Sequence, residues 1–387
     1  MNSCGNYRVL VHLYNSFGEI DWVMQNLYQI NSLKSIQVDF FVSSSKLHKK
    51  LMNSEYYSLL DRGRILKLNS VLSLFDQKIE YIVRRYKNDF VKNILYLLIN
   101  FMSGLTKINF LSYDAIFVDS NLKHGIFLDK LLRSNFNGKF FVYPHSFGKV
   151  SFGDLATIKE IKDCAFLFNS HVDKLNWIMS SGYSEKRCYV AGGITVRPEK
   201  FDNESTDILL LTRDAFTVEY GFSRQAAINQ FRRVVIELEK CGYRIFFRHH
   251  PRDNRQDEWS KGTEKYIEEF TSSRNSRHSF RAVLSMYSTA IIPYISKRVP
   301  VFDISPYDAG INADFPRHRK VGDKLISDLS DAGLVEQLDD LENLVQIILS
   351  DDELRTISRK QRRSFKSYIG KYDFLSLEDL LELSFVE

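Results

Sequence analysis

A hydrophobic segment in the second half of the chain ends in two histidines, a proline and flanking arginines. The segment reads Phe-Phe-Arg-His-His-Pro-Arg-Asp over residues 246–253, and its candidate ligand-binding side chains are Arg248, His250 and Arg252. Pro251 fixes the chain direction and disfavours helical geometry at His250. An imidazole beside guanidinium groups can give a phosphate both directed hydrogen bonds and positive charge. A polar strand end with a structural histidine is the alternative, but the flanking arginines favour phosphate binding.

Three more residues of this half could hold a phosphate. Ser288 and Thr289 open a helix predicted over residues 288–296, where hydroxyl groups, backbone N–H groups and the helix dipole favour an anion. Arg213 follows another hydrophobic run and could pair with a phosphate through its guanidinium. An ordinary helix cap is the alternative for the two hydroxyl residues, because serine and threonine are common there.

The first half offers three candidates for a general base. His145 follows a hydrophobic run in the segment Tyr-Pro-His-Ser-Phe-Gly-Lys, and an unperturbed imidazole titrates near neutral pH. Glu19 and Asp21 stand in a loop after the first hydrophobic run and offer carboxylates instead. A structural histidine at position 145 and a helix cap at Asp21 are the alternatives.

Short hydrophobic runs alternate with helical patterns along the chain, as buried parallel strands and their crossover helices do. In the first half the strands are predicted at residues 7–13, 37–42, 113–118, 139–143, 165–169 and 187–191. In the second half they are predicted at residues 207–212, 243–247, 282–284 and 299–304. Ser223 is the predicted N-cap of a helix that Gly242 ends, and another helix is expected around residues 264–272.

The hydrophobic pattern lapses at residues 192–206 into glycine, proline and charged residues, which indicates a domain boundary. The predicted parts are a first domain over residues 1–194, a linker over 195–206, a second domain over 207–372, and a C-terminal helix over 373–387 that packs back on the first domain. The fold class is α/β, with two doubly wound Rossmann-like domains facing a cleft. Ligands of such sheets bind outside the carboxyl ends of the strands.

Charge and composition limit the classes of ligand and cofactor that the protein is expected to bind. The net charge of +5 over 387 residues suits a polyanionic ligand or an acidic membrane surface but is far from that of a nucleic-acid-binding protein. The four cysteines are scattered and the acidic doublets look like solvated faces, so we expect no metal. Glycine-rich dinucleotide and Walker phosphate motifs are absent, which disfavours those cofactors.

Localisation is predicted to be cytoplasmic, since the chain starts without a basic and apolar leader. Residues 94–102 (ILYLLINFM) are the most apolar stretch, much shorter than the roughly 20 residues that span a bilayer. They favour a buried helix, with peripheral contact to the inner membrane as the alternative.

The His-Pro segment followed by Ser288 and Thr289 resembles bacterial GT-B sialyltransferases and polysialyltransferases, and the CDP-glycerol glycerophosphotransferases of teichoic acid synthesis. By that likeness His250, Ser288 and Thr289 would hold the phosphate of a cytidine nucleotide. The segment around His145 loosely resembles the Trp-His-Gly-Thr-Pro-Leu-Lys motif of the glycerophosphotransferases, whose histidine acts as the base. The glycine of that motif is replaced by Ser146 here, and the lysine comes one position early.

The resemblance implies a metal-independent, inverting glycosyltransferase without a separate cofactor. Its donor would be a CMP-linked sugar of the sialic acid or Kdo type, and its acceptor a capsule or lipopolysaccharide glycan or glycolipid. Three alternatives stay open: a CDP-glycerol or polyol-phosphate transferase, a UDP-sugar 2-epimerase-like enzyme, and a non-catalytic glycan- or nucleotide-binding protein.

Overall fold

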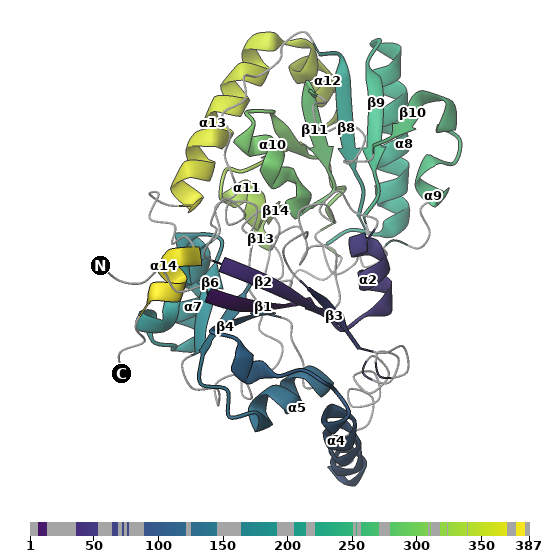
Figure 1. The fold of residues 1–387 in the computed structure, drawn as a ribbon. Helices are drawn as coiled ribbons and strands as arrows, with labels where there is room; N and C mark the ends of the chain where they lie inside the picture. The colour runs from purple at the N-terminus through teal and green to yellow at the C-terminus, as the bar shows by residue number, and fades with distance from the viewer. Residues whose placement is uncertain are drawn as a thin grey trace. The chain divides into compact units, whose positions relative to one another are not determined.

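The computed structural model describes residues 7–13, 36–52, 64–68, 72, 76, 89–120, 125–144, 164–191, 205–213, 221–250, 253, 257–270, 279–308, 310, 318–322, 324–338, 340–369 and 377–383. The chain divides into two compact units. The first holds Met1–Ile194 with Tyr372–Glu387, and the second holds Thr195–Lys371. Each is built on a parallel sheet with helices packed against it (Figure 1).

The first unit contains a seven-stranded sheet in the order β3-β2-β1-β4-β5-β6-β7, with parallel pairing throughout. Its strands are β1 (Tyr7–Leu13), β2 (Ile36–Val42), β3 (Ile65–Lys67), β4 (Ala115–Asp119), β5 (Lys139–Tyr143), β6 (Cys164–Phe168) and β7 (Cys188–Val190). The order reverses between β1 and β4, as in a doubly wound sheet. This reversal is the topological switch point of the unit.

Helices pack on both faces of that sheet. One face carries α4 (Asp89–Gly104), α5 (Ile126–Arg133) and α7 (His171–Ser181), and the other α2 (Ser45–Met52) and α14 (Leu377–Glu382). Phe127 and Trp177 belong to the first core, and Leu47 and Leu380 to the second. Both faces being buried explains why the strands read as continuous hydrophobic runs without polar alternation.

The buried helix predicted at residues 94–102 is only partly buried. Leu95 and Ile99 of α4 are buried, but Leu97 and Phe101 are each 67% exposed. The helix is apolar on two sides, and only one side packs on the unit. Among the described residues no helix has the length and hydropathy needed to cross a membrane.

The second unit contains a six-stranded sheet whose order, β10-β9-β8-β11-β12-β15, repeats the winding of the first. Its strands are β8 (Asp207–Leu211), β9 (Arg244–Arg248), β10 (Ile267–Glu269), β11 (Ala282–Ser285), β12 (Val301–Asp303) and β15 (Glu336–Gln337), all paired in parallel. The switch point lies between β8 and β11. The fold class predicted from the sequence, α/β with two doubly wound Rossmann-like sheets, is confirmed.

The long helix of this unit, α8 (Arg224–Lys240), also has its predicted limits. The Ser223 hydroxyl accepts a hydrogen bond from the Ala226 N–H at 3.1 Å, and Gly242 follows with φ of 80°. Shorter helices are α9 (Asp257–Ser260), α10 (Ile292–Ser296), α11 (Asp328–Asp331), α12 (Leu341–Leu349) and α13 (Asp351–Ile369). A separate hairpin pairs β13 (His318–Val321) with β14 (Lys324–Ser327).

The helix predicted at residues 264–272 is wrong. A single 3-10 turn at Glu264–Tyr266 leads into β10, which pairs with β9 from Ile267 opposite Ile245 onward. The Phe270 N–H then donates to the Phe247 carbonyl at 2.7 Å. The edge of β9 offers unpaired backbone groups, and pairing with that edge satisfies the segment better than two turns of an isolated helix.

Candidate functional site

Four neighbouring strand ends form the carboxyl edge of the second sheet. β9 is followed by His249 and His250, β8 by Thr212 and Arg213, and β11 by the turn of residues 286–288. β12 lies next to β11 and ends at Asp303. Ligands of open α/β sheets bind outside the carboxyl ends of the strands at the switch point, here between β8 and β11. His250 follows β9 and Ser288 follows β11, the two strands that flank β8. The site therefore spans the switch point.

The backbone of His250 is fixed from two sides. Its N–H donates to the Thr212 hydroxyl at 3.2 Å, and its carbonyl accepts from the Asp253 N–H at 2.9 Å. The carboxylate of Asp253 in turn accepts from Arg224 at 3.0 Å and from the Trp259 indole at 2.7 Å. The end of β9 is therefore fastened to β8, α8 and α9, which sets the direction in which His250 leaves the strand.

His249 lies beside the same threonine. Its Nδ1 is 3.4 Å from the Thr212 hydroxyl, and its ring meets that of Phe247 edge to face at 4.7 Å. Burial lowers the pKa of His249, which favours the neutral imidazole. The Thr212 hydroxyl can then donate a hydrogen bond to Nδ1 of His249, because its oxygen already accepts one from the His250 N–H.

Tyr287 takes a left-handed backbone conformation, with φ of 48°, two residues after the end of β11. The Arg213 guanidinium donates to the Tyr287 carbonyl at 3.0 Å, and the Tyr287 N–H donates to the carboxylate of Asp303. The Tyr287 hydroxyl donates to Asp328 at 2.9 Å. Such a conformation costs free energy in a bulky residue and persists only where surrounding contacts enforce it. Strain of this kind at a switch point is typical of ligand-binding turns.

Asp303 supports that turn from β12. It is buried, and its carboxylate accepts from the Ser305 hydroxyl at 2.6 Å and the Tyr307 hydroxyl at 2.6 Å. Burial raises the pKa of Asp303, while the hydrogen bonds that it accepts work against that rise. Burial and the neighbouring Asp303 raise the pKa of Tyr307 well above its ordinary value. Tyr307 therefore stays protonated and remains a hydrogen-bond donor.

The helical segment predicted over residues 288–296 does begin at these two hydroxyl residues, but its first turn is not α-helical. A 3-10 turn over Thr289–Ile291 comes first, and α10 then has five residues. Pro293 lacks a backbone N–H, so it fits the first turn of a new helix better than the interior of one that starts at Ser288. The buried Ser288 hydroxyl accepts from the Ala290 N–H at 3.3 Å and still has a proton to donate. The side chain of Thr289 lies outside the described residues.

The predicted arginines have contacts within the unit. Arg213 is buried and fixes the Tyr287 turn, as described above. Arg248 bonds the half-buried Tyr294, and that bond opposes the rise that burial causes in the pKa of Tyr294. Arg252 lies outside the described residues. Of the predicted phosphate ligands, the structure thus brings His250, Arg213 and Ser288 to one edge.

The first unit has a buried histidine at the end of β1. The Nε2 of His12 is 2.7 Å from the Ser43 hydroxyl, and its ring stacks on Phe127 with centroids 3.9 Å apart. Burial lowers the pKa of His12 to about 3, so the imidazole is neutral at physiological pH. The proposed bases His145, Glu19 and Asp21 all lie outside the described residues.

Sequence reasoning missed four residues of these edges: Thr212, Tyr287, Asp303 and His12. Each stands inside or directly after a hydrophobic run, where a polar side chain has a reason to be kept. Asp303 interrupts the run Val-Pro-Val-Phe-Asp-Ile and was the most visible of the four. Among the described residues no group of histidine, cysteine and acidic side chains is arranged to hold a metal ion.

Comparison with known proteins identifies the fold. No protein-family model matches the sequence, and no curated protein matches it. The UDP-GlcNAc 2-epimerase from Neisseria meningitidis bound to UDP-GlcNAc is similar in structure, with 12% identity, 93% of this chain and 98% of that chain covered, and a TM-score of 0.54. TcCGT1 in complex with UDP has 10% identity, 98% coverage of both chains and a TM-score of 0.55.

A third similar structure is UGT2 of Phytolacca americana complexed with UDP-2fluoro-glucose and pterostilbene. It has 11% identity, coverage of 97% of this chain and 98% of that chain, and a TM-score of 0.52. Likeness at this level of identity concerns the fold, and it extends over both units. With its two parallel α/β sheets, the chain has the GT-B-like fold that these epimerases and glycosyltransferases share.

Proposed function

We propose that the protein is a glycosyltransferase that moves a sugar from a nucleotide-activated donor to a glycan or glycolipid. The observation that carries the proposal is the strained Tyr287 turn at the switch point of the second sheet, with His250 and Ser288 after the two strands that flank β8. A GT-B-like fold supports it, since the similar structures include complexes with UDP and nucleotide sugars.

The donor phosphate is proposed to lie over the ends of β9 and β11. The Ser288 hydroxyl would donate to a phosphate oxygen, and His250 would do so from the other side, with Thr289 and Arg252 adding further donors. Stabilisation of the leaving phosphate by preformed donors is the main catalytic effect expected at such a site. Arg213 and Arg248 would act as positioning residues through Tyr287 and Tyr294.

The His145 base and the donor rest on the resemblance of the sequence motifs, and the two carboxylate alternatives rest on their place after the first hydrophobic run. His145 is the proposed base, with Glu19 and Asp21 as alternatives, and the donor is proposed to be a CMP-linked sugar or a CDP-linked polyol. We propose inversion at the sugar carbon and no requirement for a metal ion. The acceptor would be a bacterial surface glycan.

The decisive experiment measures binding and turnover with the same nucleotides. Thermal shifts with CMP, CDP, UDP and GDP should be largest with a cytidine nucleotide, and the matching activated sugar should be consumed only with an acceptor. Consumption should persist in EDTA. A shift with UDP alone would exclude the cytidine donor, and no shift with any nucleotide would indicate a non-catalytic glycan-binding protein.

The phosphate assignment has its own pair of variants. Ser288→Ala removes the proposed phosphate donor, and we expect kcat/KM to fall about 100-fold with the donor. Ser350→Ala is the matched control, because the Ser350 hydroxyl also accepts one backbone N–H, from Glu353 at 3.4 Å. Equal activity of both variants would remove Ser288 from the site.

A UDP-sugar 2-epimerase is the second candidate, favoured by the similarity to epimerase structures over both units. Incubation with UDP-GlcNAc in the absence of acceptor separates the two. An epimerase would equilibrate the configuration at C2, whereas the proposed transferase would leave the sugar unchanged. Exchange of the C2 hydrogen with deuterated water, followed by NMR, reports the first outcome directly.

A further inference from the structure

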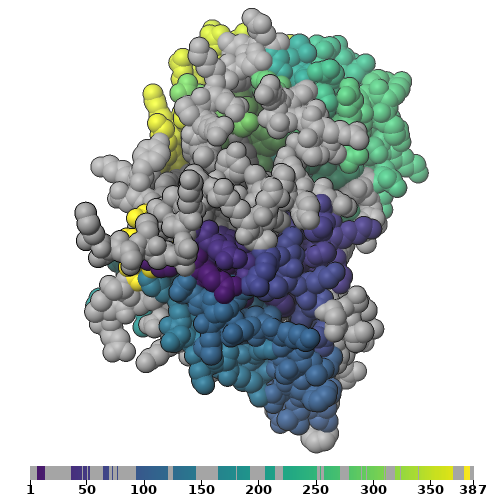
Figure 2. All heavy atoms as spheres, in the orientation of Figure 1, coloured from purple at the N-terminus to yellow at the C-terminus, as the bar shows by residue number. Residues whose placement is uncertain are grey.

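The outer side of α4 carries an apolar stripe that no core explains. Its members are all at least two-fifths exposed: Ile94, Leu97, Leu98, Phe101 and Leu105, at 43%, 67%, 41%, 67% and 57%. They recur at spacings of three and four residues, which places them along one side of a helix. Figure 2 shows atoms of α4 at the molecular surface.

The opposite side of α4 already supplies the packing contacts of the helix. Leu95 and Ile99 are buried, Met102 packs on the core of the first unit, and the Ser103 hydroxyl donates to Asp129 of α5 at 2.6 Å. The stripe is therefore additional to what folding of the unit requires. A row of exposed apolar side chains this long is typical of a surface that contacts something else.

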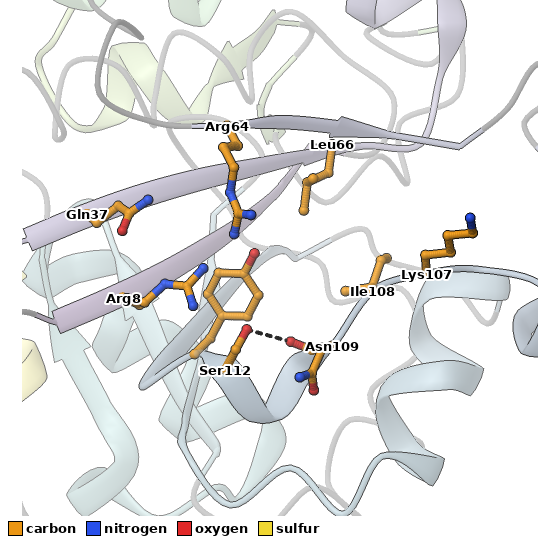
Figure 3. Close-up of a pocket in the computed structure, with 9 residues that line it drawn as sticks. Arg8, Gln37, Arg64, Leu66, Lys107, Ile108, Asn109 and Ser112 are labelled. Carbon is orange, nitrogen blue, oxygen red and sulfur yellow. Dashed lines mark hydrogen bonds between the residues drawn. The ribbon is translucent and has the colours of Figure 1, made fainter.

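A basic pocket of about 530 Å³ lies at the amino edge of the same sheet. Its walls come from the starts of β1, β2 and β3 and from the segment between α4 and β4 (Figure 3). The lining residues are Arg8, Gln37, Arg64, Leu66, Lys107, Ile108, Asn109, Ser112 and Tyr113. Seven residues of β1 separate this edge from the carboxyl edge, about 20 Å at 3.3 Å per residue. The pocket is therefore remote from the edge where a ligand of the sheet binds.

Two of the three cations in the pocket are positioned by one buried carboxylate. Asp39 accepts from Arg64 at 2.9 Å, from Arg8 at 3.4 Å and from the Tyr113 hydroxyl at 2.9 Å. Burial raises the pKa of Asp39, but these hydrogen bonds outweigh it and hold the pKa below its ordinary value. The carboxylate stays charged and orients both guanidinium groups, which point toward the pocket in Figure 3.

Within the part of the chain that the structure describes, the positive charge of the pocket is not fully compensated. A second carboxylate, that of Asp114, accepts from the Arg8 backbone N–H at 2.7 Å. Lys107 adds a third cation, and Arg8 Nε is buried without a hydrogen-bond partner among the described residues. Among the described residues, two guanidinium groups, a nearby lysine and an unused donor thus stand against two carboxylates, which suits an incoming anion.

Stripe and pocket are parts of one continuous surface. Leu105 continues the stripe, Lys107 and Ile108 line the pocket two and three residues later, and Leu111 is again 61% exposed. Apolar side chains beside a cationic pocket match the two layers of a membrane surface, acyl chains beneath anionic headgroups. A soluble anion would explain the pocket but not the stripe.

We propose that this surface docks the protein on a membrane that contains anionic phospholipids, with α4 lying in the interface and a headgroup phosphate in the Arg8–Arg64–Lys107 pocket. The contact is peripheral, because the apolar residues occupy one side of a single helix. It goes beyond the proposed glycosyl transfer and does not depend on it. A membrane-bound enzyme would meet a lipid-linked acceptor in two dimensions instead of three.

Vesicle co-sedimentation of the full chain tests the docking surface. We expect binding to vesicles of phosphatidylglycerol with phosphatidylcholine, weak binding to phosphatidylcholine alone, and release by salt. Leu97→Gln with Phe101→Gln should reduce binding at least about tenfold, and Lys107→Gln about fivefold. Thermal unfolding should stay unchanged, since all three side chains lie outside the core.

Matched controls exist in the same unit. Leu175 and Met179 of α7 are 53% and 84% exposed, so Leu175→Gln with Met179→Gln removes as much surface apolarity without touching the stripe. Lys49→Gln removes one exposed cation from α2, which follows the opposite edge of the sheet. Both controls should bind vesicles like the wild type.

Three results would overturn the proposal. If the wild-type protein does not bind anionic vesicles, membrane docking is excluded. If the α4 and α7 variants lose equal amounts of vesicle binding, the stripe is not the docking surface. A wild-type dimer in sedimentation velocity that becomes monomeric in the α4 variant would show that a second copy of the chain covers the stripe. Nucleotide binding, measured in parallel, should be the same in every variant, so failure here is separable from failure of the proposed function.

Discussion

The two sheets share a strand order, yet the described polar groups at their switch points are held in different ways. In the first unit the neutral His12 contacts Ser43, the Tyr143 hydroxyl donates to the His12 carbonyl at 2.8 Å, and the buried Asp119 ends β4. In the second unit Arg213, Asp303 and Asp328 hold three different atoms of Tyr287. The same winding therefore places a buried neutral histidine at one switch point and a strained tyrosine turn at the other.

This difference shows that the place where a ligand binds and the kind of ligand that binds are determined by different features. Topology determines where a ligand can bind, because the switch point opens the carboxyl edge in both units. Charge and backbone strain determine what binds there. Preformed donors around the Tyr287 turn suit a phosphate, and Asp303 and Asp328 lie behind the turn as its supports.

Removal of the Asp303 carboxylate should have the largest effect. Asp303→Ala leaves the buried Ser305 and Tyr307 hydroxyls and the Tyr287 N–H without their acceptor, and we expect a loss of about 3–5 kcal/mol in the free energy of unfolding. Urea unfolding measures it. Asp331→Ala is the control, because its pair with Arg319 is exposed and is worth only about 0–1 kcal/mol. Equal losses would contradict the role of Asp303 as a support of the Tyr287 turn.

Arg213→Ala should cause the second largest loss of stability and the largest loss of activity. It leaves the Tyr287 carbonyl without its donor, at a cost of about 1–3 kcal/mol, and frees the strained turn to relax. We expect kcat/KM for the donor to fall about 100-fold, since small displacements of a positioned site are costly. Arg213→Lys keeps the charge but not the fork of donors, and should recover part of the loss. Full recovery would assign the role of Arg213 to charge alone.

The sequence predicted the framework of both units and part of one site. Continuous apolar runs identified most strands, and Ser223 and Gly242 marked the ends of α8 because caps are local signals. The helix expected at residues 264–272 failed because an edge strand is decided by its neighbour, β9, and not by its own pattern. For α4 the apolar pattern was correct but could not tell which side would be covered.

The supports of the site were harder to predict than its ligands. His250 and Ser288 follow strands and carry recognisable chemistry, so they could be proposed from the sequence. Tyr287 looks like an ordinary aromatic residue, and its role depends on a backbone angle and on partners 41 and 74 residues away. Long-range hydrogen bonds of this kind have no local signature.

The buried His12 should make the stability of the first unit depend on pH. The pKa of His12 is about 3 in the folded state and 6.5 in the reference state, so only the unfolded chain gains its proton between these values. Stability is therefore complete above pH 6.5 and is lost as the pH falls toward 3, at about 1.4 kcal/mol per pH unit. Hydrogen exchange of β1 and β4 peptides measures it. In His12→Gln the dependence should be flatter by that amount, and an unchanged slope would show that His12 is already charged or exposed.

Tyr287→Phe should have the smallest effect and the most informative one. It deletes only the hydroxyl that donates to Asp328 at 2.9 Å, at a cost of about 1–2 kcal/mol for a bond to a charged acceptor. Tyr189→Phe is the control, because its hydroxyl bonds a carbonyl at an exposed site and should cost about 0.5 kcal/mol. The contacts of Arg213 and Asp303 with the Tyr287 backbone remain in the variant, so kcat/KM should change less than about threefold. If Tyr287→Phe instead reduces activity as much as Arg213→Ala, the working element is the hydroxyl and its carboxylate partner. The backbone turn would then be only its support, and the contrast between the two switch points would rest on side chains and not on backbone strain.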